Sequence, residues 1–232
     1  MSKSTASAGD YLKLIYNATA IALVADNAAT TPLTNIFVAA HTADPGTAGD
    51  QTTSEAAYTG YARATVARTS GGWTVNLTPP VSVSPVANAS FGACTAGSST
   101  ITHWSSGKVV SGASPIFHRG VFGSRLGAFS AVVAGNAITV PQLAALLAVN
   151  DRIAFYALAS GTSGLPGGVT EGTVYFVITV STDVITVSTT QGGSSITLTT
   201  AGDGICFRVT PIVVSAGITP QLGTTGNPIV EE

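Results

Sequence analysis

Charged side chains are scarce in this sequence. It has 9 Lys or Arg and 11 Asp or Glu among 232 residues, so charged residues make up 9% of the chain, against about 25% in a typical soluble domain. Nine cations are too few for the dense basic surface that displaces counterions from nucleic acid, so we expect no nucleic-acid partner. Isolated soluble proteins use charge to resist association. The shortage therefore favours a protein whose surface is largely covered by neighbouring subunits.

Long apolar runs are also missing, although the mean hydropathy is +0.41. A membrane-spanning helix needs about 20 consecutive, mostly apolar residues. The best candidate, residues 128–149, is interrupted by Gly135 and Pro141. Asp10 and Lys13 lie where a signal peptide would be apolar. We therefore expect no membrane contact and no cleaved signal peptide.

Cysteine is represented by two residues only. Cys94 and Cys206 lie far apart in the sequence, each inside an apolar segment. Buried free cysteines have this pattern. A disulfide framework would need more cysteines in a shorter chain, and a zinc site would need paired ligands. We predict two buried free thiols.

Patterns that carry catalysis or metal binding are incomplete. The closest match to a serine-hydrolase elbow, residues 161–165, lacks the closing glycine. His41 and Asp44 could supply two metal ligands, but a simpler interpretation is that Asp44 closes a turn at residues 44–46 and His41 is a strand residue. The acids lie in loops or near the chain end, with no sign of a buried pair. We therefore predict no catalytic residue, no cofactor and no metal ligand, in a protein that is not an enzyme.

The pattern of the remaining residues predicts a mainly β fold. Short runs of β-branched and aromatic residues are separated by Gly, Pro, Asn and Asp. A short helix is expected at residues 10–17, where Asp10 can act as N-cap and apolar residues recur at helical spacing. The N-terminal helix is thus followed by a β-sandwich or barrel-like domain.

A second small β domain is predicted as an insertion. Beyond about residue 128 the sequence becomes a series of short segments of strongly β-forming composition. The closing residues 212–232 contain too few consecutive apolar residues to form a domain alone. We therefore assign residues 1–128 and 210–232 to one domain and residues 129–209 to an inserted module. A plain tandem of two domains is the alternative.

Two segments resemble known phage proteins. Residues 36–69 and 98–107 resemble small tailed-bacteriophage virion proteins labelled head decoration or tail fibre protein. The resemblance rests on HTADP at 41–45, YTGYAR at 58–63 and ITH at 101–103. Residues 137–180 are similar to a β module of many phage structural proteins, and this similarity rests on three short sequences: NDRIAF at 150–155, LPGGV at 165–169 and GTVYFV at 172–177. Smaller members of the first family lack this module.

The resemblance implies a non-enzymatic structural protein on the surface of a phage particle. Its first interpretation is a capsid decoration (cement) protein that stabilises the head, bound to the major capsid protein or other virion subunits and forming homo-oligomers. The inserted module would then face outward. A tail-fibre or tail-tip component contacting the host surface is the alternative, and a carbohydrate-binding module is the second alternative.

The N-terminal helix supplies the candidate particle contacts. Tyr11, Leu12, Ile15 and Tyr16 could bury apolar surface on a neighbouring subunit when the helix orders there. In this interpretation the helix is an arm, and the β domain should fold without it.

Overall fold

The computed structural model describes residues 5–21, 32–78, 81–142, 146–158, 164–225 and 229–231. These residues form seventeen short β-strands, one α-helix and one 3-10 turn. The fold is therefore mainly β with a short N-terminal helix, which confirms the predicted fold class. Within the described ranges, no helix combines the length and apolar character needed to cross a membrane.

The chain divides into two compact units, each of which we describe by itself. Unit 1 consists of Met1–Phe122 and Ile212–Glu232, and unit 2 consists of Gly123–Pro211. At the base of unit 2, Gly123 is the register partner of Val209. A Cβ atom at position 123 would lie 1.8 Å from the carbonyl oxygen of Arg208, so glycine is required for this close approach. The segments that enter and leave unit 2 therefore run side by side.

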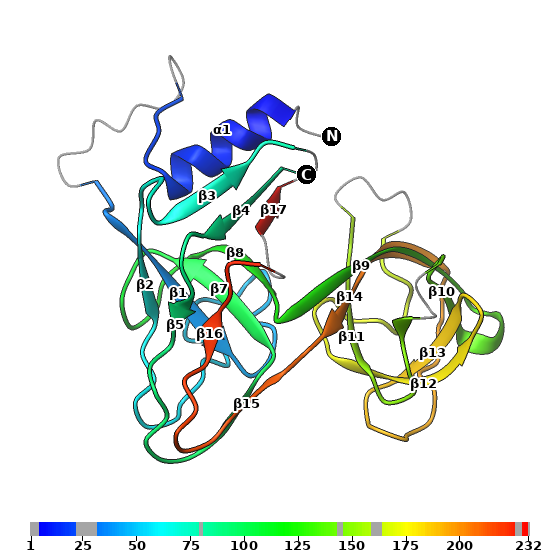
Figure 1. The fold of residues 1–232 in the computed structure, drawn as a ribbon. Helices are drawn as coiled ribbons and strands as arrows, with labels where there is room; N and C mark the ends of the chain where they lie inside the picture. Colours follow the sequence, from blue (N-terminus) through cyan, green and yellow to red (C-terminus); the bar gives the residue numbers. More distant parts are fainter. Residues whose placement is uncertain are drawn as a thin grey trace. The chain divides into compact units, whose positions relative to one another are not determined.

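The described part of unit 1 contains one helix and four antiparallel sheets (Figure 1). Its elements are α1 (Thr5–Tyr16), β1 (Asn35–His41), β2 (Ala64–Ala67), β3 (Trp73–Asn76), β4 (Val81–Pro85), β5 (Ala89–Ser90), β6 (Ser99–Ile101), β7 (His103–Gly107), β8 (Ile116–Val121), β15 (Ile212–Val214), β16 (Gln221–Leu222) and β17 (Ile229–Glu231). The largest sheet has the strand order β2-β1-β7-β8, and a three-stranded sheet has the order β17-β4-β3. The other two sheets pair β15 with β6 and β16 with β5.

The C-terminal segment completes three of these four sheets. Strands β15, β16 and β17 pair with β6, β5 and β4, which precede unit 2 in the sequence. Unit 1 is therefore closed only by chain that follows unit 2.

Helix α1 is part of the core of unit 1. It packs against β3 and β4, and Leu12 and Tyr16 are completely buried. The Tyr16 ring lies edge-on to Trp73, with 4.7 Å between ring centres. The helix begins at Thr5 and not at Asp10, so the predicted N-cap is wrong. Two physical reasons are the high helix propensity of alanine and the burial of Ala8 in the same core.

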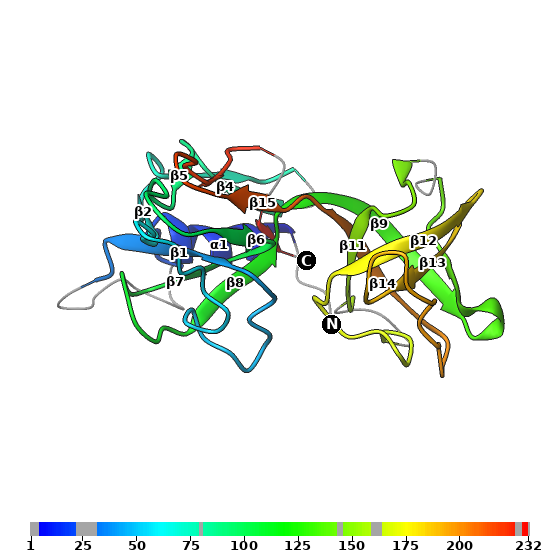
Figure 2. The ribbon, with the colours of Figure 1, turned by 90° about the horizontal axis from the view of Figure 1, so that it is seen from below.

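Unit 2 is a closed antiparallel barrel with the strand order β10-β13-β12-β11-β14-β9 (Figures 1 and 2). Its elements are β9 (Gly123–Val132), η1 (Ala134–Asn136), β10 (Ala137–Thr139), β11 (Arg152–Tyr156), β12 (Tyr175–Ser181), β13 (Val184–Ser188) and β14 (Gly202–Val209). Inward-facing residues such as Phe129, Phe155 and Tyr175 fill the barrel. A closed barrel has no free edge strand that could pair with another chain.

Both cysteines are buried and free, as predicted. Cys94 lies in the core of unit 1 and Cys206 in the core of unit 2. Burial raises the pKa of the Cys206 thiol to about 12. This thiol is therefore protonated at neutral pH and a poor nucleophile.

Candidate functional site

Two of the motifs that carry the resemblance, HTADP and YTGYAR, contribute residues to a buried polar cluster around Arg63. The Nε and Nη2 atoms of Arg63 donate to the two carboxylate oxygens of Glu55 at 2.7 and 2.9 Å. Further N–H groups donate to Gln51 Oε1 and to the backbone carbonyls of Val109 and Gly112 at 2.8–3.2 Å. The Arg63 side chain is 1% exposed. This bidentate, fully partnered guanidinium rigidly ties the loop before β2 to the turn after β7.

Tyr61 and His41 extend the cluster. The Tyr61 hydroxyl donates to Glu55 Oε1 at 2.8 Å and accepts the backbone N–H of Ala40 at 3.1 Å. Burial raises the pKa of Tyr61 well above its ordinary value. His41 Nδ1 lies 2.9 Å from the carbonyl oxygen of Thr53. Because a carbonyl can only accept, Nδ1 carries the proton of the neutral ring.

The other nitrogen of His41 faces a serine. His41 Nε2 lies 2.7 Å from Ser105 Oγ, so the serine hydroxyl donates to it. A serine bonded to an imidazole is the arrangement of an activated nucleophile. Both side chains are, however, 0% exposed. No substrate can reach this pair in the folded protein, and its role is structural.

Asp44 closes the turn that follows β1, as predicted. Its Oδ1 accepts the backbone N–H of Gly46 at 3.1 Å, and its other oxygen pairs with Arg119 of β8. The described residues include no group of three or more His, Cys, Asp or Glu side chains arranged to hold a metal ion. His41 and Asp44 thus contribute hydrogen bonds and an ion pair to the fold.

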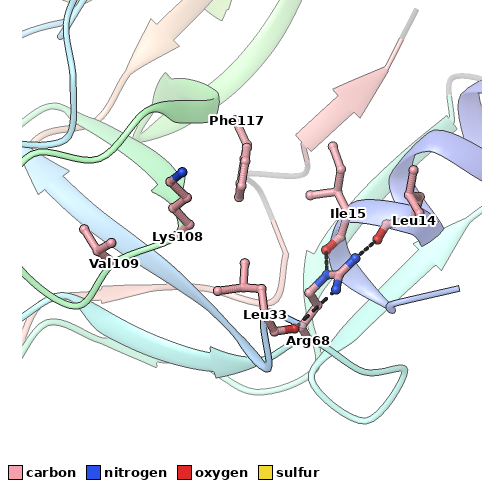
Figure 3. A pocket seen from close by; sticks show the side chains of 7 residues that line it. All are labelled: Leu14, Ile15, Leu33, Arg68, Lys108, Val109 and Phe117. Carbon is pink, nitrogen blue, oxygen red and sulfur yellow. Dashed lines mark hydrogen bonds between the residues drawn. The ribbon is translucent and has the colours of Figure 1, made fainter. Parts of the chain in front are cut away.

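Unit 1 also contains a pocket beside the C-terminal end of α1, which we call the α1 pocket (Figure 3). Its cavity volume is about 460 Å³. It is lined by Leu14, Ile15, Leu33, Arg68, Lys108, Val109 and Phe117. In Figure 3 the residues from β8 and from the turn after β7 line one side, and Arg68 and the helix residues line the other. A volume of this order is typical of sites for small ligands or a few side chains.

Arg68 caps the C-terminal end of α1 and forms part of the pocket wall. Its guanidinium donates to the carbonyl oxygens of Leu14 and Ile15 and, at 3.2 Å, to that of Leu33. The last carbonyls of a helix have no partner within the helix and carry partial negative charge. Burial lowers the pKa of Arg68, which still leaves an arginine protonated at neutral pH. Sequence reasoning missed this residue because nothing near position 68 indicates that a distant helix ends there.

The four predicted particle contacts separate into two pairs. Leu12 and Tyr16 are 0% exposed and pack inside unit 1, so they cannot reach a neighbour while α1 remains docked. Tyr11 is 37% exposed and lies edge-on to His118, and Ile15 lines the α1 pocket. Contact of these four residues with a neighbouring subunit stays a prediction, and for Leu12 and Tyr16 it would require α1 to leave the core of unit 1.

Comparison with known proteins identifies the class of protein. Residues 15–128 match the family described as podophage GP4 fiber I protein gp80. No curated protein and no solved structure matches the chain. The protein is therefore a phage structural protein located in the virion particle.

The match also favours one role within the particle. It names a fibre protein and therefore supports the tail-fibre alternative better than the capsid-decoration interpretation that we placed first. The matched residues cover most of the N-terminal part of unit 1 and reach only into β9 of unit 2. The rest of the barrel lies outside the match.

Proposed function

We propose that this chain is a fibre component of a tailed phage, in which unit 1 attaches to other virion subunits and unit 2 is displayed toward the host surface. The observation that carries the proposal is the match of residues 15–128 to a fibre protein family. Only unit 1 contains the matched loops, the polar cluster and the α1 pocket. Attachment is therefore assigned to unit 1.

The loops of unit 1 are held in place before a neighbouring subunit binds. Its loops are held by a buried, bidentate ion pair between Arg63 and Glu55 and by the hydrogen bonds of His41. Loops fixed in this way lose little conformational entropy when a neighbouring subunit binds them. A preformed contact surface therefore results from the same residues that carry the family resemblance.

The barrel of unit 2 has an outer face with aromatic and cationic groups. Phe155 points into the barrel, so its neighbour Tyr156 lies on the outer face of β11, where it is half-buried, its hydroxyl oxygen is covered, and its ring lies edge-on to Phe207 at 5.5 Å. On the same side the guanidinium of Arg152 stands 5.4 Å from the ring centre of Phe176. Aromatic rings and arginine are enriched where proteins recognise partners. This face supports contact with the host.

The position in the particle can be tested by immunogold electron microscopy of intact phage with antibodies against the full chain. We expect label on the tail or its fibres, with at most a few tens of copies per particle. Label distributed over the head in hundreds of copies would instead establish the decoration role and end this proposal.

Host contact can be tested by adsorption competition with the purified full-length protein. We expect the protein to slow phage adsorption and the double variant Tyr156→Ala/Phe207→Ala to lose at least five-fold of this effect. Thr179 and Thr186 form an exposed hydrogen-bonded pair elsewhere on the barrel, so Thr179→Ala/Thr186→Ala is the matched control. Equal competition by both double variants would show that the aromatic face does not contact the host.

A further inference from the structure

Among the described residues, the α1 pocket has more positive charge than the acids around it neutralise. Arg68 and Lys108 both line it, and within the described ranges no carboxylate forms an ion pair with either side chain. Two acids of unit 1 have other partners, since Glu55 pairs with Arg63 and Asp44 with Arg119. The carbonyl end of a helix offers about half an elementary negative charge. The two positive charges of Arg68 and Lys108 are therefore offset by only about half an elementary negative charge among the described residues.

Such an excess is unusual for an enclosed arginine. Arg68 is 9% exposed, and buried charges in proteins are generally paired. Lys108 is exposed at the pocket rim and can move toward a bound group. The electrostatics of the pocket therefore favour an anion.

The other residues that line the pocket are apolar, so the bound anion should carry an apolar group. Leu14, Ile15, Leu33, Val109 and Phe117 supply aliphatic and aromatic surface around the two cations. A bare inorganic anion would leave this surface in contact with water. A carboxylate carried among apolar groups would satisfy both the cations and the walls.

The pocket is held in shape before anything binds. Val109 is fixed by the hydrogen bond from Arg63 to its carbonyl oxygen at 3.1 Å, and the backbone N–H of Lys108 donates to Ser114 Oγ at 3.0 Å. Arg68 is fixed by its three carbonyl partners. All lining residues except Leu14 lie within the segment that matches the fibre family. The pocket therefore lies in the part of the chain to which we assign attachment.

We propose that the α1 pocket receives an acidic side chain, carried among apolar residues, from a neighbouring virion subunit. This inference rests on the proposed function, because it places the pocket at a contact between subunits. It adds the chemistry of the partner: a peptide segment in which Asp or Glu is flanked by apolar residues.

The chemistry of the pocket can be tested on the purified full chain by ligand-detected NMR with three probes of equal length. Hexanoate carries the anion and the apolar body, hexanol carries the body alone, and hexylamine carries the opposite charge. We expect hexanoate to bind at least ten-fold more tightly than either of the others. Equal affinity for hexanoate and hexanol would overturn the charge argument.

A single variant tests the role of the exposed cation. Lys108→Gln should weaken hexanoate binding at least five-fold and leave hexanol binding unchanged. Lys13→Gln removes the same charge from α1 outside the pocket lining and should change neither. Unchanged unfolding temperatures would show that both variants are folded, and undiminished hexanoate binding by Lys108→Gln would overturn the proposal.

The same two variants, introduced into the phage, test the partner. We expect Lys108→Gln to lower the content of this protein in purified particles at least three-fold, with Lys13→Gln at the parental level. A normal content of Lys108→Gln, together with its loss of hexanoate binding, would mean that the pocket takes a free small acid and would overturn docking. Immunogold label on the head, with hexanoate selectivity intact, would instead reject the fibre assignment and leave the pocket chemistry standing.

Discussion

At the scale of single residues, the motifs of this sequence act through buried hydrogen bonds. Arg63, Tyr61 and Glu55 form one connected group, and His41 joins β1 to the loop before β2 and to β7. Removing one partner from such a group leaves a buried polar atom or charge without compensation, which costs about 1–5 kcal/mol depending on the group. These residues are therefore constrained by folding before any function is considered.

His41 makes the stability of unit 1 depend on pH. Burial lowers its pKa below the ordinary value, and the positive charge of Arg63 acts in the same direction, whereas the Thr53 carbonyl, Glu55 and Asp44 oppose it to a smaller extent. The unfolded chain therefore binds a proton on this residue at a higher pH than the folded chain does. The contribution of His41 is fully present above the unfolded pKa of about 6.5 and is lost as the pH falls below it.

We expect the free energy of unfolding to decrease by up to about 1.4 kcal/mol per pH unit below pH 6.5 from this residue alone. Denaturant unfolding at pH 7.5, 6.5 and 5.5 measures the slope. His41→Gln should be less stable at pH 7.5 but should show a shallower loss toward pH 5.5. Parallel curves for the two proteins over this range would contradict the assignment of the pH dependence to His41.

At the scale of elements, the sequence predicts the strands better than the ends of the helix. The alternation in residues 61–68 overlaps the shorter β2, since a half-buried strand imposes a period of two on its side chains. The apolar run at residues 36–40 lies within β1, which is buried over most of its length. The helix start differs by five residues, since alanines in the preceding segment extend the helix. The cap by Arg68 depends on a tertiary contact more than fifty positions away, and no local pattern records it.

Because one face of α1 is buried, substitutions at two adjacent residues should differ in their effect on stability. Leu12 is completely buried and Tyr11 is 37% exposed. We expect Leu12→Ala to lower the free energy of unfolding by about 2–5 kcal/mol, because it leaves a cavity in the core. Tyr11→Ala should cost less than about 1 kcal/mol, as surface substitutions generally do.

Chemical denaturation of the purified variants measures both values, and the exposed Tyr11 serves as the matched control within the same turn of α1. Similar costs for the two substitutions would mean that α1 is not docked on unit 1 in solution. The arm hypothesis would then return, and with it the expectation that unit 1 folds without residues 1–17.

At the scale of the whole molecule, the connection between the units decides whether the predicted insertion is a separate domain. The chain enters and leaves unit 2 through Gly123 and Val209, which are register partners in neighbouring strands. The barrel is closed and has its own core. Unit 1, in contrast, needs β15, β16 and β17 from the segment beyond residue 211 to complete three of its sheets. Sequence composition indicated an insertion, but the pairing of the closing strands depends on tertiary contacts.

These connections determine how the molecule should respond to being divided. Residues 123–211 alone should fold as a soluble barrel with a single cooperative unfolding transition, because their two ends already lie side by side. Unit 1 with residues 125–207 replaced by two glycines should also fold, since the gap to be closed is that between adjacent antiparallel strands, about 5 Å. Removing residues 212–232 from the full chain should instead unfold unit 1. Circular dichroism and calorimetry of the three proteins measure these outcomes. If the shortened unit 1 is insoluble while the full chain is folded, the two units depend on each other for folding.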